Sequence, residues 1–383
     1  MRIPTPLHAL RAFSTLLLPA LLILGCAREA AAPRPDIVVY LVDTLRADHL
    51  EIYGYERPTS PALTAFAERA IVYENAYSPS SWTKPSVASL LTGMYPSSHL
   101  ALEKRDLLPE SVVTAAEYFR ENGYETAAIV SSPWIIPTFR FDQGFDHFEI
   151  VELNGSVRGT RASHVHAAVA RFLASRAEED RAPLFLYVHT RDPHAPYAPA
   201  PEHLRAVDPD YDGAMSSVAQ GSDSEVDIAS VRTLYDGEIR ANDAAFGALM
   251  TELEAAGIDD NAAIVFTSDH GEEFMEHGTI GHGKVVWNVA VHIPLVIKLP
   301  GDRFAGTRIG RAASLVDVLP ALGEIAGLPP REEWEGRSVL PASAREGERE
   351  RSIFVDESRD AVERFAVIEH PWKGIYETRP EQS

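Results

Sequence analysis

Short, continuous apolar runs recur along the chain, with amphipathic segments between them. The first, "DIVVYLVD" at residues 36–43, is rich in β-branched residues and lacks a polar face. Such a run is typical of a strand that is buried on both faces of a parallel sheet. Four further runs have the same character and predict further strands, at residues 124–130, 184–190, 262–268 and 294–299.

Helical periodicity separates these runs. One helix is predicted before Gly257, because four apolar residues follow the i, i+3, i+4, i+7 spacing: Phe246, Leu249, Met250 and Leu253. A second helix is expected from Leu315 to Leu322. Strands that alternate with helices predict an α/β fold, with a large, mainly parallel (mixed) central sheet flanked by helices.

Polar residues follow three of the predicted strands. Asp43 ends the first, His189 lies near the end of the strand at 184–190, and Asp269 and His270 follow the strand at 262–268. In parallel sheets, active sites gather beyond the carboxyl ends of the strands. We therefore expect these side chains to lie along one edge of the sheet.

The N-terminus has the features of an export signal. A basic start precedes an apolar stretch at 12–24, which is shorter than the roughly 20 apolar residues of a membrane span. It ends in "LILGC", similar to a bacterial lipobox. This predicts a lipoprotein signal peptide at 1–25, a lipidated Cys26, a tether at 26–35 and a place in the bacterial cell envelope (periplasm or outer membrane). A plain cleaved signal and a short membrane anchor are the alternatives.

Composition limits the possible functions. The 383 residues include 35 Lys and Arg against 56 Asp and Glu, a formal net charge of −21, which argues against nucleic acid as a partner. An anionic substrate would need a local positive centre. The single cysteine, Cys26, leaves no disulfide and no catalytic thiol. Residues 208–227 are acidic and Gly/Ser-rich and predict a surface insertion, and a small α+β subdomain, reduced or incomplete, is expected at 331–383.

Three of the residues at the predicted sheet edge are candidate metal ligands. Asp43 and Asp269 offer hard carboxylate oxygens and His270 offers a borderline nitrogen, which together suit one divalent ion such as Ca, Mn, Zn or Mg. The plainer interpretation is that each aspartate caps the turn after its strand.

Thr83 is the candidate nucleophile. In "SSWTKPSVASLLTG", Pro85 suits the first turn of a helix and Gly93 its end, so Thr83 is expected just before a helix N-terminus, where negative charge is favoured. A threonine hydroxyl reacts only when a base or a metal lowers its pKa. Without a metal beside it, Thr83 would be a capping or turn residue.

The order of motifs resembles the sulfatase family of the alkaline phosphatase superfamily, over residues 36–330. Eight segments carry the resemblance: "LVDTLRADHLEIYGY", "TSPALTAFAERA", "WTKPSVASLLTGMYP", "HTRDPHAPY", "YDGEIRANDAAFGALMTELEAAGI", "VFTSDHGEEFMEHG", "GHGKVVWNVAVHIPLVIKLPG" and "SLVDVLPALGEIAG". The resemblance implies an alkaline-phosphatase-like catalytic domain that hydrolyses anionic esters.

The resemblance also implies roles for single residues. Asp43, Asp269 and His270 fall at metal-ligand positions. Thr83 falls at the nucleophile position, where it is also expected to bind the metal. Lys284, in "HGK", matches a lysine that holds the anionic group of the substrate.

Two histidines and one glutamate complete the implied site. His194, in "PHAPY", matches a histidine near the leaving group and is a candidate general acid. His282 and Glu272 are expected to support the site or the fold.

The chain departs from the family at the anion site. Sulfatases that use formylglycine carry C-x-P-x-R or S-x-P-x-R, whereas the aligned residues here are Thr83, Pro85 and Val87, and threonine cannot be oxidised to an aldehyde. Thr44 replaces a second acid, and "VSSPWII" at 130–136 replaces a Gly-Lys-Trp-His element. A threonine ester must be cleaved by water, which favours phosphoryl or phosphonate groups over sulfuryl groups.

Together these observations predict a metal-dependent hydrolase of sulfate or phosphate/phosphonate esters. Its substrate would be a sulfated or phosphorylated small molecule, glycan or lipid. Two alternatives remain open: a transferase of phospho-headgroups at the membrane, and a catalytically inactive lipoprotein that uses the fold for binding.

Overall fold

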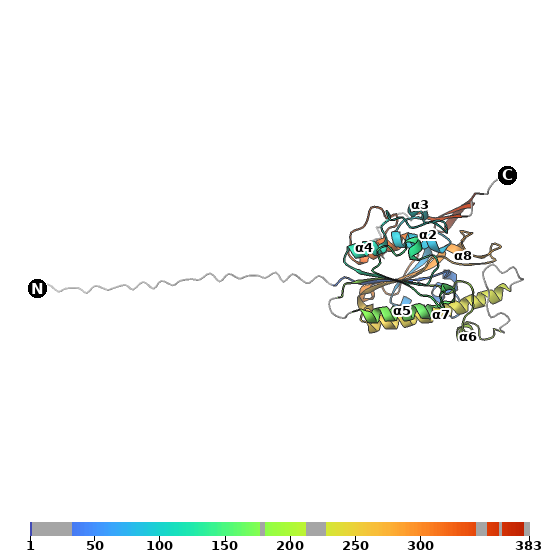
Figure 1. Ribbon diagram of the computed structural model, residues 1–383, viewed down its shortest axis with the longest axis horizontal. Coiled ribbons are helices and arrows are strands. Elements are labelled where there is room, and N and C mark those ends of the chain that lie inside the picture. Colours follow the sequence, from blue (N-terminus) through green and yellow to red (C-terminus); the bar gives the residue numbers. More distant parts are fainter. Residues whose placement is uncertain (2–32, 177–180, 212–226, 342–350, 360–361, 379–383) are drawn as a thin grey trace. The chain divides into compact units, whose positions relative to one another are not determined.

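The computed structural model describes residues 1, 33–176, 181–211, 227–341, 351–359 and 362–378 (Figure 1). The predicted signal peptide, Cys26 and most of the tether and of the acidic insertion lie outside the described residues. Residues from Arg34 onward form one compact unit. Within the described part of the chain, no helix has the length and apolarity that crossing a membrane requires.

A nine-stranded mixed sheet forms the centre of this unit, in the order β10-β2-β9-β6-β1-β5-β3-β4, with β11 paired to β2. β1 lies between β5 and β6 and is parallel to both, whereas β9 runs antiparallel to β2 and β6. The strands are β1 (Asp36–Val42), β2 (Ile71–Tyr77), β3 (Glu125–Val130), β4 (His147–Ile150), β5 (Leu184–Thr190), β6 (Ala262–Ser268), β9 (His292–Lys298), β10 (Thr307–Ile309) and β11 (Ala313–Ser314).

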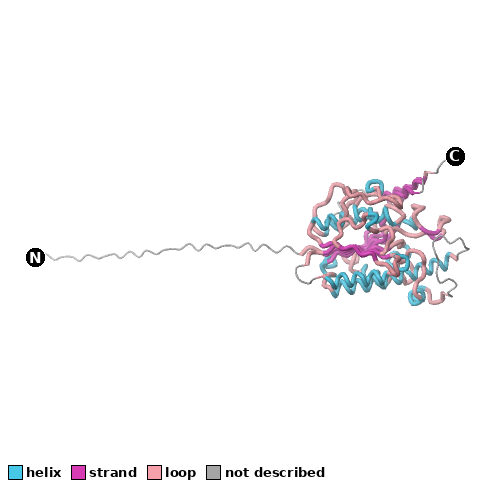
Figure 2. Tube along the Cα trace, in the orientation of Figure 1, coloured by secondary structure: helices cyan, strands magenta, loops and turns pink. Residues whose placement is uncertain are grey.

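Helices cover both faces of the sheet (Figure 2). Alternate residues of β1 point to opposite faces of the sheet. Leu41 packs in a core with α2, α4 and α9, whereas Tyr40 packs in a core with α1, α5 and α7. The helices are α1 (Pro61–Ala67), α2 (Thr83–Thr92), α3 (Pro96–His99), α4 (Ala115–Glu121), α5 (Ala162–Ser175), α6 (Pro201–Val207), α7 (Ile228–Ala255), α8 (Asn288–Val291) and α9 (Val318–Ile325). One-turn 3₁₀ helices occur at Ala47–His49, Glu51–Tyr53, Pro137–Phe139, Val157–Gly159, Asp259–Asn261, Pro300–Asp302 and Leu315–Asp317.

The predicted α/β class, with its mixed sheet and flanking helices, is confirmed, and each of the five apolar runs is a strand. β2 was not predicted, because Glu74 and Asn75 interrupt its apolar pattern. Its pairing with β9 shifts register between Tyr73 and Ala76, so the polar pair falls at an irregularity of the ladder. The direction of β9 was also not foreseen, since an apolar run does not encode whether a strand is parallel.

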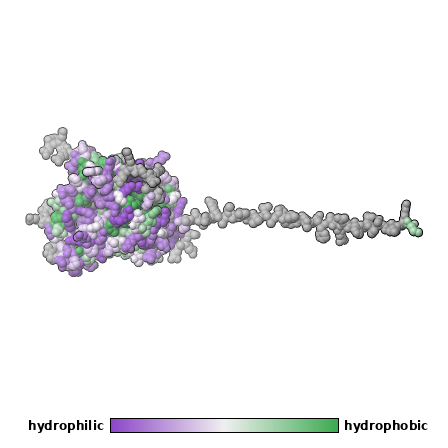
Figure 3. Space-filling view, turned by 180° about the vertical axis from the view of Figure 1, so that it is seen from behind, coloured by the Kyte–Doolittle hydropathy of each residue, from purple (hydrophilic) through white to green (hydrophobic). Residues whose placement is uncertain are grey.

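Outward-facing residues on the face drawn in Figure 3 are mainly hydrophilic, with scattered apolar ones. This matches a chain of which 24% is charged and in which the large apolar side chains fill two cores.

Three C-terminal strands form a separate antiparallel sheet: β12 (Ile353–Arg359), β13 (Val362–Glu369) and β14 (Trp372–Glu377). Its apolar face packs against Tyr77 and the α8 region, around Ile353 and Ile368. The Glu357 carboxylate also accepts hydrogen bonds from the hydroxyls of Ser80 and Ser81, each at 2.9 Å. The C-terminal sheet therefore supports the loop that leads into α2. The domain boundary expected near residue 330 stays a prediction.

Buried His99 makes stability depend on pH. Its Nδ1 accepts a hydrogen bond from the Ala101 amide at 3.1 Å, which leaves the ring proton on Nε2, 3.1 Å from the Pro85 carbonyl oxygen in α2. Burial lowers the pKa of His99 to about 4 from 6.5. The unfolded state therefore binds more protons between these values, and stability falls as the pH drops through them.

We expect this histidine to contribute about 2 kcal/mol to the loss of stability between about pH 7.5 and about pH 5. Urea unfolding of the wild type and of His99→Gln at both pH values measures the difference. The variant should be less stable than the wild type at the higher pH and should lose less stability on acidification. Equal losses in both proteins would contradict the assignment.

Candidate active site

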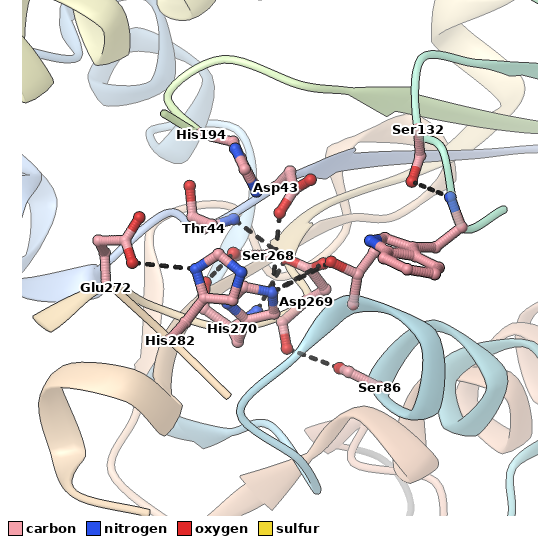
Figure 4. A network of polar contacts seen from close by, with 12 residues as sticks. Asp43, Thr44, Ser86, Ser132, His194, Ser268, Asp269, His270, Glu272 and His282 are labelled. Atoms are coloured by element: carbon pink, nitrogen blue, oxygen red, sulfur yellow. Dashed lines mark hydrogen bonds and ion pairs between the residues drawn. The ribbon is translucent and has the colours of Figure 1, made fainter. Parts of the chain in front are cut away.

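The carboxyl edge of the central strands gathers the polar residues that were expected there. β5, β1 and β6 are neighbours, and Val42 pairs with Thr190 on one side and with Ser268 on the other. The next residue of β1 and the next of β6 are therefore Asp43 and Asp269, side by side. Both are buried, at 1% and 0% exposure. Figure 4 shows this cluster at the strand ends.

Three buried polar atoms in this cluster have no hydrogen-bond partner among the described residues: Asp43 Oδ1, Asp269 Oδ2 and His189 Nε2. The three side chains offer ligand atoms that all lie within 4.8 Å of one another. Leaving such atoms unpaired in a protein interior costs free energy. Two carboxylates and one imidazole nitrogen are a fitting donor set for a divalent cation, so the residues present fit the expected metal.

His270 faces the same point from the turn after β6. Its Nδ1 lies 2.9 Å from the Gly271 carbonyl oxygen, which only an N–H can satisfy, so Nε2 carries the free lone pair. That Nε2 lies 3.4 Å from Asp269 Oδ2 and 3.7 Å from Asp43 Oδ1. His270 therefore has the orientation of a metal-ligating histidine, as the sequence predicted.

Thr83 is the first residue of α2, one position further into the helix than expected, and is 2% exposed. Its Oγ1 lies 3.3 Å from His270 Nε2, so the candidate nucleophile touches the candidate metal site. Ser86, one turn later, donates a 2.6 Å hydrogen bond to the Asp269 carbonyl oxygen. This bond holds the helix N-terminus against the turn that carries Asp269 and His270.

The pKa values of the two neighbouring carboxyl groups, Asp43 and Asp269, are shifted in opposite directions. Burial raises the pKa of Asp269, and the charge of Asp43 raises it further. Burial also acts to raise the pKa of Asp43, but His194, His189 and His270 outweigh it and hold that pKa below its usual range. A cation bound at this point would favour the ionised form of both carboxylates.

His282 and Glu272 form a supporting pair. His282 Nδ1 lies 2.9 Å from Glu272 Oε1, and Tyr197 donates a 2.7 Å hydrogen bond to Glu272 Oε2. The His282 ring is 4.4 Å from the ring of His270 and 5.1 Å from that of His194. Burial raises the pKa of Glu272 to about 7. Figure 4 shows the Glu272–His282 contact beside His270.

His194 lies half-buried beside Asp43 (Figure 4). Its Nδ1 is 2.6 Å from the Ala195 carbonyl oxygen and 2.9 Å from Arg191 Nη2. Burial lowers the pKa of His194 to about 4. This side chain is therefore neutral at neutral pH. It is the residue that the sequence proposed as the general acid.

Of the two lysines near the site, Lys284 is free to contact a substrate, whereas Lys84 is held by the protein. Lys284 is exposed, two residues after His282. Lys84 follows Thr83 directly, yet its ammonium group donates to the carbonyl oxygens of three loop residues and lies 3.5 Å from the centre of the Phe139 ring. Those oxygens belong to Glu103, Lys104 and Asp106. Lys84 is therefore a structural cation, and Lys284 remains the candidate for contact with substrate.

Gly271 is required by close packing in the "DHG" turn. A Cβ at this position would lie 2.1 Å from the Val289 carbonyl oxygen in α8, far inside contact distance. The Gly271 amide also donates a 2.8 Å hydrogen bond to the Ala290 carbonyl oxygen. Glycine therefore lets α8 lie directly against the turn that presents His270.

Two residues of the site were missed in the sequence. His189 was placed at the sheet edge but was not assigned as a ligand, although it begins the motif "HTRDPHAPY", in which only His194 was given a role. The signal was its position near a strand end, beside that of Asp43. Arg191 was not singled out at all, and its burial could not be read from a loop sequence.

Comparison with known proteins agrees with this arrangement of fold and site. The family model described as Sulfatase matches residues 35–328. The chain belongs to the sulfatase family. An ulvan-active sulfatase of Formosa agariphila is 26% identical to this family member over 333 residues, which are 80% of this chain and 64% of the relative. The chain thus spans less than two thirds of that relative's length.

Other similar proteins of known activity differ in substrate. An N-acetylglucosamine-6-O-sulfatase of Bacteroides thetaiotaomicron is 24% identical to this sulfatase-family chain, with 87% of the chain and 76% of the relative covered. The crystal structure of a phosphonate monoester hydrolase of Agrobacterium radiobacter superposes with a TM-score of 0.72, at 19% identity, over 90% of this chain and 87% of that one. This likeness shows the shared alkaline-phosphatase-like fold.

Proposed function

We propose that this sulfatase-family chain is a metal-dependent hydrolase of sulfate or phosphate/phosphonate esters, with Thr83 as its nucleophile. The observation that supports this most is the position of Thr83 Oγ1, 3.3 Å from His270 Nε2. That nitrogen faces the unpaired oxygens of Asp43 and Asp269. A hydroxyl, a helix N-terminus and a set of metal-binding atoms thus meet at one point.

A divalent cation held by Asp43, Asp269, His189 and His270 would supply the positive charge that lowers the pKa of the Thr83 hydroxyl and stabilises the substrate oxygens. Thr83 Oγ1 then forms a bond to phosphorus or sulfur as the bond to the leaving oxygen breaks. The amides at the N-terminus of α2 favour the negative charge that develops near Thr83.

The leaving oxygen needs a proton, and the Thr83 hydroxyl loses one as it attacks. We assign both transfers to His194, which is neutral at neutral pH and can therefore take up the proton of Thr83 and pass it to the leaving oxygen. The ring lies beside Asp43 and 5.1 Å from the ring of His282. A water molecule then cleaves the Thr83 ester, which restores the hydroxyl and releases the acid anion. Lys284, which is exposed beside His282, contacts the anionic group as it enters.

The charge of the site favours esters that carry a single negative charge. Ser131, whose amide donates to the His189 carbonyl oxygen at 2.9 Å, and Ser132 are uncharged residues at the end of β3. A dianionic phosphate monoester would therefore meet few fixed cations. Sulfate monoesters, phosphate diesters and phosphonate monoesters are monoanions, and the threonine nucleophile favours the two phosphorus classes among them.

The relatives suggest where such an ester would be found. The ulvan-active sulfatase and the N-acetylglucosamine-6-O-sulfatase are named for saccharide substrates. We propose an ester attached to a saccharide, processed outside the cytoplasm by a protein tethered through lipidated Cys26.

A substrate panel tests this function. Purified protein is stripped with a chelator, reloaded separately with Mn, Zn, Ca or Mg, and assayed on four nitrophenyl esters: a sulfate, a phosphate monoester, a phosphate diester and a phenylphosphonate. We expect metal-dependent turnover, fastest on the diester or the phosphonate. No turnover with any metal would reject the hydrolase, and fastest turnover of the phosphate monoester would reject the charge argument.

A further inference from the structure

One buried arginine near the site forms no direct ion pair with a carboxylate of the described residues. Arg191 follows β5, two residues after His189, and is 6% exposed. Its Nη2 donates a 2.8 Å hydrogen bond to the Ala195 carbonyl oxygen and lies 2.9 Å from His194 Nδ1. The guanidinium group is thus in direct contact with the residue that we assign to the leaving group.

The other fully buried arginine of the described residues, Arg46, is neutralised by carboxylates, and so is the half-buried Arg161. Arg46, which is 4% exposed, forms ion pairs of 2.7 Å with Asp48 and 2.8 Å with Glu276. Arg161 forms an ion pair of 2.6 Å with Glu238. Arg191 forms no such pair with any carboxylate of the described residues.

The adjacent acid does not neutralise it. Asp192 Oδ2 accepts a 2.8 Å hydrogen bond from the Ala162 amide, and Asp192 Oδ1 lies 3.6 Å from Arg161, so this carboxylate serves another partner. Burying a charge without a counter-ion is costly, and proteins retain such a group where a ligand supplies the opposite charge.

Arg191 has donors to spare for a ligand. A guanidinium group carries five N–H bonds in a planar fork that matches the oxygens of phosphate and sulfate. The hydrogen bonds it makes with the described residues all use Nη2, so Nε and Nη1 remain available. Arg191 Nη2 lies 2.9 Å from His194 Nδ1, and His194 lies beside Asp43 (Figure 4). The guanidinium group is therefore next to the candidate metal ligands.

We propose that Arg191 forms an oxyanion subsite, which binds a non-bridging oxygen of a sulfate, phosphate or phosphonate group held at Thr83. Arg191 would supply the positive charge that formylglycine-dependent sulfatases have in the arginine of C-x-P-x-R, where this chain has Val87. The identity of the substrate rests on the function proposed above, whereas binding of the anion itself does not.

Calorimetric titration of the metal-loaded protein with inorganic phosphate, and separately with sulfate, tests the subsite without turnover. Arg191→Met keeps the length and loses the charge, and should bind phosphate about 10- to 100-fold more weakly than the wild type. Arg191→Lys keeps the charge without the fork and should fall between the two. Unchanged affinity in Arg191→Met would overturn the proposal.

Thermal unfolding separates anion binding from a structural role. Without anions, Arg191→Met should unfold at no lower temperature than the wild type, whereas Arg46→Met, which breaks two ion pairs, should unfold at a lower one. A fixed phosphate concentration that saturates the wild type should raise the Tm of the wild type and of Arg46→Met more than that of Arg191→Met. Equal stabilisation of all three by phosphate would refute the subsite.

Kinetics then distinguish the two proposals. If esters are hydrolysed, Arg191→Met should raise KM more than it lowers kcat for monoanionic esters. If no ester is hydrolysed but phosphate affinity still drops in the variant, the proposed hydrolase fails and the oxyanion subsite stands.

Discussion

Replacing Thr83 by alanine is expected to lower kcat by about 10³- to 10⁵-fold. The Thr83 hydroxyl lies at the N-terminus of α2, 3.3 Å from His270 Nε2. Without it no covalent ester forms, and only direct attack by water remains. Turnover of the preferred nitrophenyl ester by metal-loaded protein measures the loss.

Two further substitutions make this result specific. Thr83→Ser keeps the hydroxyl and should retain activity within about 10-fold, whereas Thr83→Val has nearly the same shape without the hydroxyl and should be as inactive as Thr83→Ala. All variants should bind the wild-type amount of metal, because two carboxylates and two imidazoles remain. Mass spectrometry of quenched wild-type reactions should find the added phosphoryl, phosphonyl or sulfuryl group on the peptide that contains Thr83. Wild-type kcat in Thr83→Val would exclude the nucleophile.

The second large effect concerns the metal. Asp43→Asn and Asp269→Asn should each weaken metal binding by at least about 100-fold and abolish turnover. An amide oxygen carries no net charge, so the remaining ligands attract a divalent cation much less strongly. Competition with a fluorescent chelator measures the affinity, and elemental analysis after gel filtration measures the metal retained.

A matched control lies on the same strand. Asp36 begins β1 as Asp43 follows its end, and its carboxylate accepts a 2.6 Å hydrogen bond from the Leu184 amide. Asp36→Asn should lower stability slightly and leave metal binding unchanged. In metal-free protein, Asp269→Asn should be at least as stable as the wild type, since it removes one of two buried, closely spaced carboxylates. Full metal content in Asp43→Asn and Asp269→Asn would disprove the site.

The sequence predicted the positions of most strands, but not the direction of β9 or the presence of β2. The run at 36–43 is β1, and the strand ends placed Asp43, His189 and Asp269 at one edge, because parallel neighbours share a direction. The reversal of β9 depends on the chain path between strands, which no local pattern encodes. Glu74 and Asn75 hid β2, since a bulged strand lacks a regular period.

Within the site, residue types were predictable but their surroundings were not. Asp43, Thr83 and His270 come together as their motifs suggested. Lys84 lies next to Thr83 in the sequence, yet carbonyl oxygens about twenty residues later surround its ammonium group. The burial of Arg191 likewise depends on how one loop folds over another. Such long-range contacts decide which charges a substrate meets.

The hydrogen bonds from Ser80 and Ser81 to Glu357 have a consequence for shortened chains. They join residues 277 and 276 positions apart, so the loop before Thr83 receives its support only when the chain through β12 is present. The central strands can pair without it, but the nucleophile is not fully held until β12 is in place. Chains that stop short of β12 should therefore fold their main sheet and remain inactive.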